Sequence, residues 1–221
     1  MLVQRPLLDV GPMVSAPETD GGRRADDNYP TPRWCTDLIL PHLPTAGVVI
    51  EPSCGAGAIL RRLAAWRPQP GVILGVELHA GRASEARAAV AEHPRAIVVN
   101  ADFLHWAPRA EVPGIGLVIG NPPFSLAIEF VEACLALARP TRATVAMLLR
   151  LAFAESRERA AFHRAHPADV YPLAKRPSFT DDGATDGAAV AWWVWGPGRG
   201  GRMHAPLLSA TDAAPGGGGA S

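Results

Sequence analysis

The 221-residue sequence predicts one α/β domain in which helices cover both faces of a mostly parallel β-sheet. Short apolar runs alternate with helical stretches along the chain, as is typical of α/β sandwiches. The first five runs are continuously apolar rather than apolar at every second position. Continuous runs indicate strands that are covered on both faces, which favours a parallel sheet.

Seven apolar runs are the predicted strands. The first five are residues 47–53, 72–78, 96–102, 115–121 and 143–150. The last two, 168–173 and 188–195, are joined by about fourteen residues without a helical pattern, which predicts a C-terminal antiparallel hairpin. Residues 128–138 place apolar side chains on one face at helical spacing, and residues 85–93 do so more weakly. We therefore expect a seven-stranded sheet with helices between the parallel strands.

The two ends of the chain differ in composition from the middle. Residues 1–28 mix proline, glycine and charge without a period, which predicts a flexible arm. Residues 197–221 are rich in glycine and are expected to be a flexible tail. The folded domain is expected to span residues 29–196.

Charge and cysteine content exclude several classes of protein. Lys and Arg together number 21, as do Asp and Glu, so bulk positive charge does not hold this chain to nucleic acid. Cys35, Cys54 and Cys134 are isolated from one another, which argues against a disulfide scaffold or a zinc site, and no metal is expected. No apolar run approaches the ~20 residues of a membrane span, and the N-terminus lacks a signal-peptide core. We expect a soluble, cytoplasmic protein.

The first predicted strand leads into a glycine turn, Glu51-Pro52-Ser53-Cys54-Gly55-Ala56-Gly57. Glycines let the chain turn tightly and let a ligand approach the main chain. A dinucleotide-binding fingerprint would need a third glycine where Leu60 stands. Glu51 would also repel a pyrophosphate, but it would attract a cation. The turn therefore favours a cationic ligand over a nicotinamide dinucleotide.

The second and third predicted strands also end in acids. Glu77 comes twenty residues after Gly57, where an acid can accept ribose hydroxyls. Asp102 and Phe103 form an acid–aromatic pair that suits a purine. Each acid alone would be explained as a helix N-cap or a solvated strand end. Because carboxyl ends of parallel strands share one edge of a sheet, the set predicts a pocket for adenosine with a cationic tail, and S-adenosylmethionine fits.

The fourth predicted strand ends in Asn121-Pro122-Pro123-Phe124. The two prolines fix an extended turn without N–H donors, which leaves the Asn121 side-chain oxygen and the Pro122 carbonyl as acceptors. Two acceptors that grip the hydrogens of a conjugated amine favour its tetrahedral form and make its lone pair available for attack on a methyl group. Phe124 offers a ring on which a planar target can stack. The alternative is a simple proline turn with a buried phenylalanine.

These motifs resemble those of the S-adenosylmethionine-dependent amino-methyltransferases of the Rossmann-like class I fold. The order and spacing of YPTP (29–32), EPSCGAG, GVEL, ADFLHW and IGNPPF look closest to DNA adenine-N6 methyltransferases in which the cofactor motif precedes N-P-P-F. Residues 175–195 resemble the C-terminal part of small phage- or plasmid-type adenine methyltransferases. The resemblance covers about residues 29–125 and implies that residues 29–196 form a methyltransferase domain. Family members usually carry a target recognition domain, for which this chain leaves no room.

The resemblance implies a role for each matching residue. Thr31 and Pro32 would contact the methionine end of the cofactor, and Glu77 would bind its ribose. Asp102 and Phe103 would hold its adenine. The cofactor turn would be formed by Glu51, Cys54, Gly55 and Gly57, and the target amine and base would be held by Asn121, Pro122, Pro123 and Phe124.

The basic segment after the fourth predicted strand is a candidate contact for the substrate. Residues 139–176 carry eight basic and three acidic side chains, a net charge of +5. They form either a phosphate-facing surface or a solvated helix face. The resemblance implies that Arg176 and Phe179, in the last hairpin loop, would be a phosphate contact and a second stacking wall. The alternative is a surface loop whose Phe179 packs into the core. The aspartates nearby, Asp181, Asp182 and Asp186, are interpreted as turn residues rather than metal ligands.

The sequence thus predicts methylation of the N6 amine of adenine in DNA, with the target base flipped into the Asn121–Phe124 pocket. Adenine in RNA and a protein glutamine amide are alternatives with the same chemistry. A non-catalytic nucleic-acid-binding protein with a cofactor fold is a further alternative, and a nicotinamide-dependent oxidoreductase is a more distant one. The oligomeric state cannot be inferred from the sequence.

Overall fold

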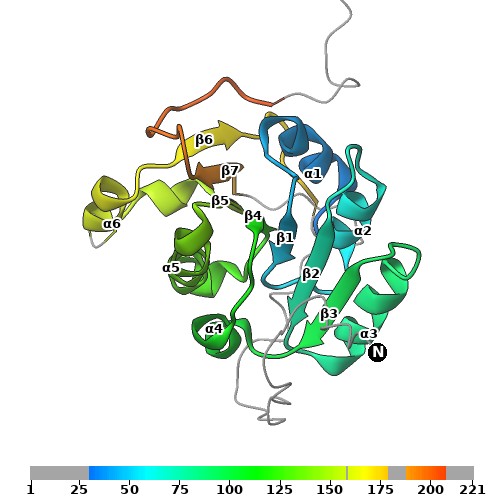
Figure 1. Cartoon of the computed structure of the whole chain (residues 1–221). Helices are drawn as coiled ribbons and strands as arrows, with labels where there is room; N and C mark the ends of the chain where they lie inside the picture. Colours follow the sequence, from blue (N-terminus) through cyan, green and yellow to red (C-terminus); the bar gives the residue numbers. More distant parts are fainter. Residues whose placement is uncertain (1–29, 158, 179–187, 208–221) are drawn as a thin grey trace, which may run out of the picture.

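A computed structural model describes residues 30–157, 159–178 and 188–207 of the chain (Figure 1). Seven strands form one sheet in the order β3-β2-β1-β4-β5-β7-β6. Their bounds are β1 Val48–Glu51, β2 Val72–Glu77, β3 Ala96–Asn100, β4 Ile115–Gly120, β5 Thr144–Arg150, β6 Asp169–Pro172 and β7 Val190–Trp195. β1 to β5 are parallel to one another, whereas β7 is antiparallel to both β5 and β6. The predicted α/β sheet and its C-terminal hairpin are confirmed.

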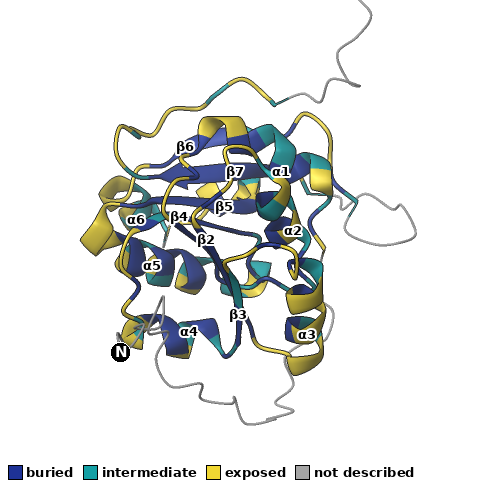
Figure 2. Cartoon of the chain, turned by 45° about the vertical axis from the view of Figure 1, so that its right-hand side comes forward, coloured by how far each residue is buried: buried dark blue, intermediate teal, exposed yellow. Residues whose placement is uncertain are grey.

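Helices cover the two faces of this sheet (Figures 1 and 2). One face carries α1 (Arg33–Ile39), α2 (Ala58–Ala65) and α3 (Ala80–Ala89), and the other carries α4 (Phe103–Trp106) and α5 (Ala127–Ala138). A short α6 (Ala160–Ala165) precedes β6. α5 matches its predicted bounds closely. α3 begins five residues earlier than the weak pattern at 85–93 predicts, because its alanine-rich sequence gives little periodic signal.

The tryptophans of β7 belong to the core. Trp192 is fully buried on the face covered by α1, and its Nε1 donates to the Cys35 carbonyl at 2.9 Å. Trp193 and Trp195 are buried on the opposite face. Because successive strand residues point to opposite faces, one strand ties together both layers of helices.

Residues 197–207 differ from the expected flexible tail. They run beside the edge strand β6, and the register pairs Val170 with Met203 and Leu173 with Leu207. The Val170 N–H donates to the Arg202 carbonyl at 2.8 Å, and the Leu207 N–H donates to the Pro172 carbonyl at 2.7 Å. This segment covers main-chain groups that an edge strand would otherwise leave unpaired. The rest of the expected tail, 208–221, and the expected arm, 1–28, lie outside the described residues.

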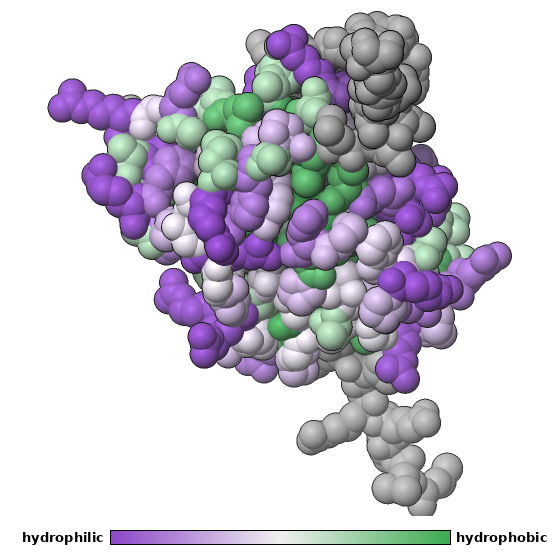
Figure 3. Space-filling model, turned by 90° about the horizontal axis from the view of Figure 1, so that it is seen from above, coloured by the Kyte–Doolittle hydropathy of each residue, from purple (hydrophilic) through white to green (hydrophobic). Residues whose placement is uncertain are grey.

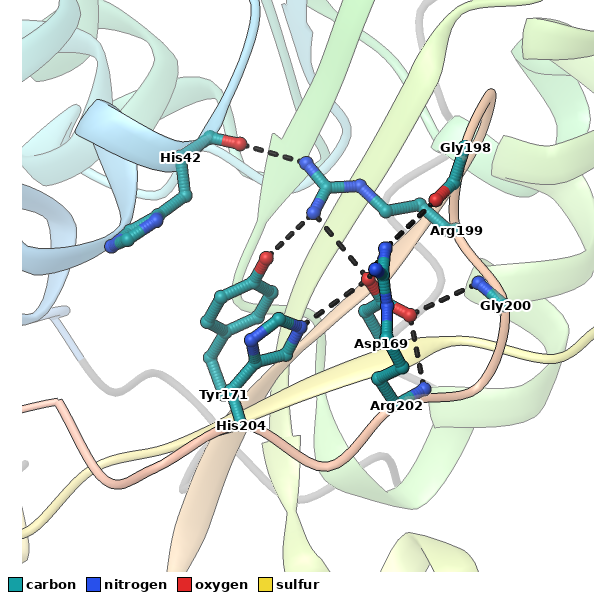
Figure 4. A network of polar contacts seen from close by, with 8 residues as sticks. All are labelled: His42, Asp169, Tyr171, Gly198, Arg199, Gly200, Arg202 and His204. Carbon is teal, nitrogen blue, oxygen red and sulfur yellow. Dashed lines mark hydrogen bonds and ion pairs between the residues drawn. The ribbon is translucent and has the colours of Figure 1, made fainter.

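The buried carboxylate of Asp169, at the start of β6, also holds this segment in place (Figure 4). Its Oδ1 accepts the N–H groups of Gly200 and Arg202, both at 3.0 Å. Its Oδ2 lies 3.1 Å from Nη2 of Arg202, 3.6 Å from Nη1 of Arg199 and 3.3 Å from Nε2 of His204. The sequence gives little sign of this network, since its members lie about thirty residues apart.

The surroundings of Asp169 set its ionisation. Burial by itself raises the pKa of a carboxyl. The N–H groups of Arg202 and Gly200 and the side chains of Arg202 and His204 outweigh burial, so the pKa of Asp169 lies well below its ordinary value. Asp169 therefore stays ionised in the folded protein and stabilises it.

The side of the molecule on which residues 197–207 lie in Figure 1 is seen from above in Figure 3. Hydrophilic side chains project around its rim, and strongly hydrophobic ones show between them only in small areas. Of the helices in the three described ranges, none is long and apolar enough to cross a membrane.

We predict that Asp169→Ala lowers the free energy of unfolding by about 1–3 kcal/mol, because the N–H groups of Gly200 and Arg202 and the half-buried Arg199 lose their buried acceptor. Urea unfolding measures the loss. Asp37→Ala is the matched control: Asp37 is partly exposed and pairs with Arg33 and Arg62. It should cost less than about 1 kcal/mol. Because the folded pKa of Asp169 is depressed, its contribution is present above about pH 4 and is lost as the pH falls below that value. Equal losses in the two variants would contradict the assignment.

Candidate functional site

The loops that follow β1, β2, β3 and β4 meet at one edge of the sheet, because these strands run parallel. The strand order reverses between β1 and β4, which are neighbours in space although β2 and β3 lie between them in sequence. Ligands of open α/β sheets bind in the crevice at such a switch point. The residues that the sequence singles out gather there.

The glycine turn forms after β1 as predicted. Gly55 and Gly57 have φ values of 52° and 85°, which favour glycine, and Gly57 precedes the first residue of α2. Cys54 is buried against β2, and its N–H donates to the Val76 carbonyl at 3.0 Å. The approach requires Gly75 in β2, because a Cβ there would lie 2.9 Å from the Cys54 sulfur. Burial, with Glu51 and Glu77 nearby, raises the pKa of the Cys54 thiol, so it stays protonated.

Glu77, at the end of β2, fixes the turn from the neighbouring strand. Its Oε2 accepts the Gly55 N–H at 2.8 Å, and its Oε1 accepts the His79 N–H at 2.8 Å. The side chain of Asn100 donates to the Glu77 carbonyl at 2.9 Å. Each carboxylate oxygen can accept more than one hydrogen, so Glu77 retains acceptor capacity for a ligand hydroxyl.

Glu51 is a buried carboxyl whose Oε2 has no hydrogen-bond partner within the described chain. Burial raises its pKa well above the ordinary value; main-chain hydrogen bonding from Leu60 opposes this rise, and the nearby charge of Glu77 adds to it. A buried oxygen without a partner is costly to folding. A ligand ammonium group is the kind of partner that would satisfy it.

Asp102 and Phe103 take structural positions at the end of β3. Asp102 is the N-cap of α4: its Oδ1 accepts the Leu104 N–H at 3.0 Å, and its Oδ2 lies 3.0 Å from Nδ1 of His105. The Phe103 ring is 2% exposed and stacks on Phe130, with centroids 5.5 Å apart. The ring is thus part of the core, so the side chain of Phe103 is not placed to pack on an adenine.

Asn121, at the end of β4, is held by two loops that lie far away in sequence. Its Nδ2 donates to Oγ1 of the buried Thr31 at 3.1 Å. The Ser53 hydroxyl lies 3.5 Å from the Asn121 carbonyl and donates to it. The segment before α1, the glycine turn and the proline motif therefore meet at Asn121: Thr31 contacts its side chain and Ser53 contacts its main chain. Pro32 directly precedes α1, and its carbonyl accepts the Cys35 N–H.

Pro122 is buried, whereas Pro123 and Phe124 are partly exposed. The Arg150 guanidinium carbon lies 4.9 Å from the centre of the Phe124 ring. Phe124 also lines a pocket of about 180 Å³ together with Ser125, Ala127, Ile128 and Arg159. The ring is thus partly exposed at this pocket, where Arg150 lies over it and Arg159 is part of the lining.

The structure describes only part of the predicted substrate contacts, and it brings to the site other residues that the sequence did not indicate. Arg176 is exposed after β6, whose carboxyl end lies at the same edge of the sheet, and Phe179 lies outside the described residues, as do Asp181, Asp182 and Asp186. The sequence did not single out Ser53, Leu78 or the roles of Arg150 and Arg159. Leu78 is 41% exposed directly after Glu77 and offers an apolar contact there. An apolar residue directly after a strand-ending acid was the signal that could have identified it.

We predict that Glu51→Gln makes the free protein more stable at pH 7, by about 1–3 kcal/mol, because it removes a carboxyl group whose ionisation burial opposes and whose Oε2 has no partner within the described residues. The folded pKa of Glu51 is raised, so wild-type stability should fall as the pH rises above about 4.3. Thermal unfolding at pH 5 and pH 7.5 measures this difference. From pH 5 to pH 7.5 the wild type should lose more stability than Glu51→Gln. Equal losses in the two proteins would contradict the assignment of Glu51 as a buried carboxyl group with a raised pKa.

No protein-family model matches the chain, and no curated protein matches it. Solved structures do. The 23S rRNA methyltransferase ErmE aligns with a TM-score of 0.57 and 22% identity over 83% of this chain and 72% of its own. A dimethyladenosine transferase from Plasmodium falciparum aligns with a TM-score of 0.56 and 13% identity over 76% of this chain and 62% of its own. At these identities the likeness establishes the fold. The chain has the Rossmann-like class I methyltransferase fold that its motifs led us to expect.

Proposed function

We propose that this protein transfers a methyl group from S-adenosylmethionine to the exocyclic N6 amine of an adenine in nucleic acid. The observation that carries the proposal is the convergence of Thr31, Ser53 and Asn121 beside the buried Glu51 at the switch point of the sheet. Neither a binding module nor an oxidoreductase requires a strand-end amide held in this way.

The residues at the ends of β1 and β2 suit the proposed cofactor. The Oε2 atom of Glu51 lacks a partner within the described residues and would accept its ammonium group. Glu77 has acceptor capacity for the ribose hydroxyls, and Leu78 offers an apolar surface for the purine. The Asp102 carboxylate, already a helix cap, could still accept a hydrogen from the adenine amine. When bound, the cofactor supplies an electrophilic methyl group.

The residues at the end of β4 activate the amine. The Asn121 side-chain oxygen and the Pro122 carbonyl accept its two hydrogens and draw the nitrogen toward tetrahedral geometry. Because Thr31 accepts from Nδ2 of Asn121, the amide oxygen is directed away from Thr31 and toward the substrate side. Catalysis then rests on positioning and electrostatics, and it needs no covalent enzyme intermediate.

DNA is the first candidate substrate, because the Asn121–Phe124 motif resembles that of DNA adenine-N6 methyltransferases. RNA is the second candidate. The names of the two fold neighbours refer to RNA or to adenosine, which favours it. In either polymer the base would be flipped out of its stack and would pack on Phe124.

The test is incubation with S-adenosylmethionine and either adenine-unmethylated DNA or unmethylated RNA, followed by digestion to nucleosides and mass spectrometry. N6-methyladenine in one polymer supports the proposal and identifies the substrate. Methylation of a protein extract with neither polymer modified would instead favour the glutamine alternative. Cofactor binding without turnover on any polymer would favour a non-catalytic protein.

We predict that Asn121→Ala lowers kcat by about 10²–10³-fold, as the loss of one transition-state hydrogen-bonding group does. The dissociation constant of the cofactor, measured by calorimetry, should change little. Wild-type turnover in Asn121→Ala would contradict the proposed activation of the amine by Asn121.

Thr31→Val should lower kcat by roughly tenfold, because Nδ2 of Asn121 loses its acceptor and the amide is free to turn. Thr31→Ser keeps the hydroxyl and should retain most of the activity, which separates positioning from packing. The resemblance assigns Thr31 to the cofactor instead. In that case Thr31→Val would weaken cofactor binding and leave kcat at saturation unchanged.

A further inference from the structure

The pocket beside Phe124 has one wall that amine activation does not use. Phe124 and Ser125 belong to η3 (Phe124–Leu126), and Ala127 and Ile128 begin α5. Arg159 comes from a different part of the chain, the residues directly before α6. α5 and α6 lie side by side in both views (Figures 1 and 2). The pocket thus links the proposed catalytic motif to the basic segment, residues 139–176.

The Arg159 side chain is held in place by an aromatic ring rather than by an acid. Its guanidinium carbon lies 5.2 Å from the centre of the Phe153 ring, which is 3% exposed in η5 (Leu151–Ala154). Within the described residues, Arg159 forms no ion pair with a carboxylate. A guanidinium on an aromatic face is oriented, and its donors remain available to an anion.

A second arginine borders the same pocket. Arg150, at the end of β5, places its guanidinium carbon 4.9 Å from the centre of the Phe124 ring. Residues 139–176 carry a net charge of +5. One of their three acids, Asp169, is buried and paired with Arg199 and Arg202, so it does not offset this charge at the pocket. The rim of the pocket therefore attracts anions.

We propose that Arg159, together with Arg150, binds phosphodiester groups of the target strand next to the adenine that Asn121 holds. The inference rests on the proposed function. A base that packs on Phe124 brings its own sugar–phosphate chain to the rim of the pocket, since the chain stays attached on both sides of a flipped base. The planar guanidinium matches a phosphate with two parallel hydrogen bonds. Such contacts position the strand and are independent of base sequence.

The test measures the affinity of the full chain for short fluorescein-labelled single-stranded DNA and RNA, each containing one adenine, by anisotropy across a salt series. Arg159→Gln should raise the Kd roughly tenfold and reduce the slope of log K against log salt by about 0.7, the value for one phosphate contact on a single strand. Arg159→Lys keeps the charge but lacks the planar guanidinium, so its Kd should lie between those of the wild type and Arg159→Gln. Arg95→Gln is the control, since Arg95 is exposed before β3 at the opposite edge of the sheet.

The outcomes separate this inference from the function on which it rests. In methylation assays, Arg159→Gln should raise the KM for the polymer and leave kcat and cofactor affinity near wild type. If the wild type binds and methylates a polymer while Arg159→Gln shows the same Kd and salt slope, the inference is overturned and the proposed function stands. If the wild type neither binds nor methylates DNA or RNA, both are overturned. The polymer for which Arg159→Gln loses more affinity is the one whose backbone the pocket accommodates.

Discussion

The clamp between Glu77 and the glycine turn is the interaction on which the arrangement of the site depends. A carboxylate at the end of one strand accepts the N–H of Gly55 from the loop after the neighbouring strand. The turn can approach β2 closely only because residue 75 is glycine. With the turn fixed, Ser53 reaches the Asn121 carbonyl and Glu51 is left buried below it. Two neighbouring carboxyl groups at a buried edge are unfavourable for folding alone, and the proposed cation site would account for their presence.

The strand order explains why these residues can act together. β1 and β4 are direct neighbours, so the loop that suits a cofactor and the loop that suits an amine begin side by side. The segment before α1 completes the arrangement, because Thr31 contacts Asn121 and α1 is anchored to β7 through Cys35 and Trp192. The antiparallel hairpin thus contributes to the site indirectly, by holding α1 in place. The Asp169 network holds the start of β6, the other strand of that hairpin (Figure 4).

Strand positions and the gathering of Glu51, Glu77, Asp102 and Asn121 at one edge could be predicted, because apolar runs and parallel pairing determine both. Three features could not. Residues 197–207 look like a glycine-rich tail in the sequence. Their fixed position depends on contacts with the buried Asp169, about thirty residues away. Phe103 follows an acid in the predicted pattern, but its ring turns into the core against Phe130. The pairing of Arg159 with Phe153 depends on how a short irregular segment folds, for which sequence periodicity carries no signal.

Calorimetric titration of S-adenosylmethionine, with NAD as the comparison ligand, tests most directly whether the buried Glu51 edge is a site for a cationic adenosine cofactor. We predict binding of S-adenosylmethionine by the wild type, no binding of NAD, and weakening by at least about tenfold in Glu51→Gln through loss of the ammonium contact. Binding of NAD without S-adenosylmethionine, or equal affinity for S-adenosylmethionine in the two proteins, would contradict it.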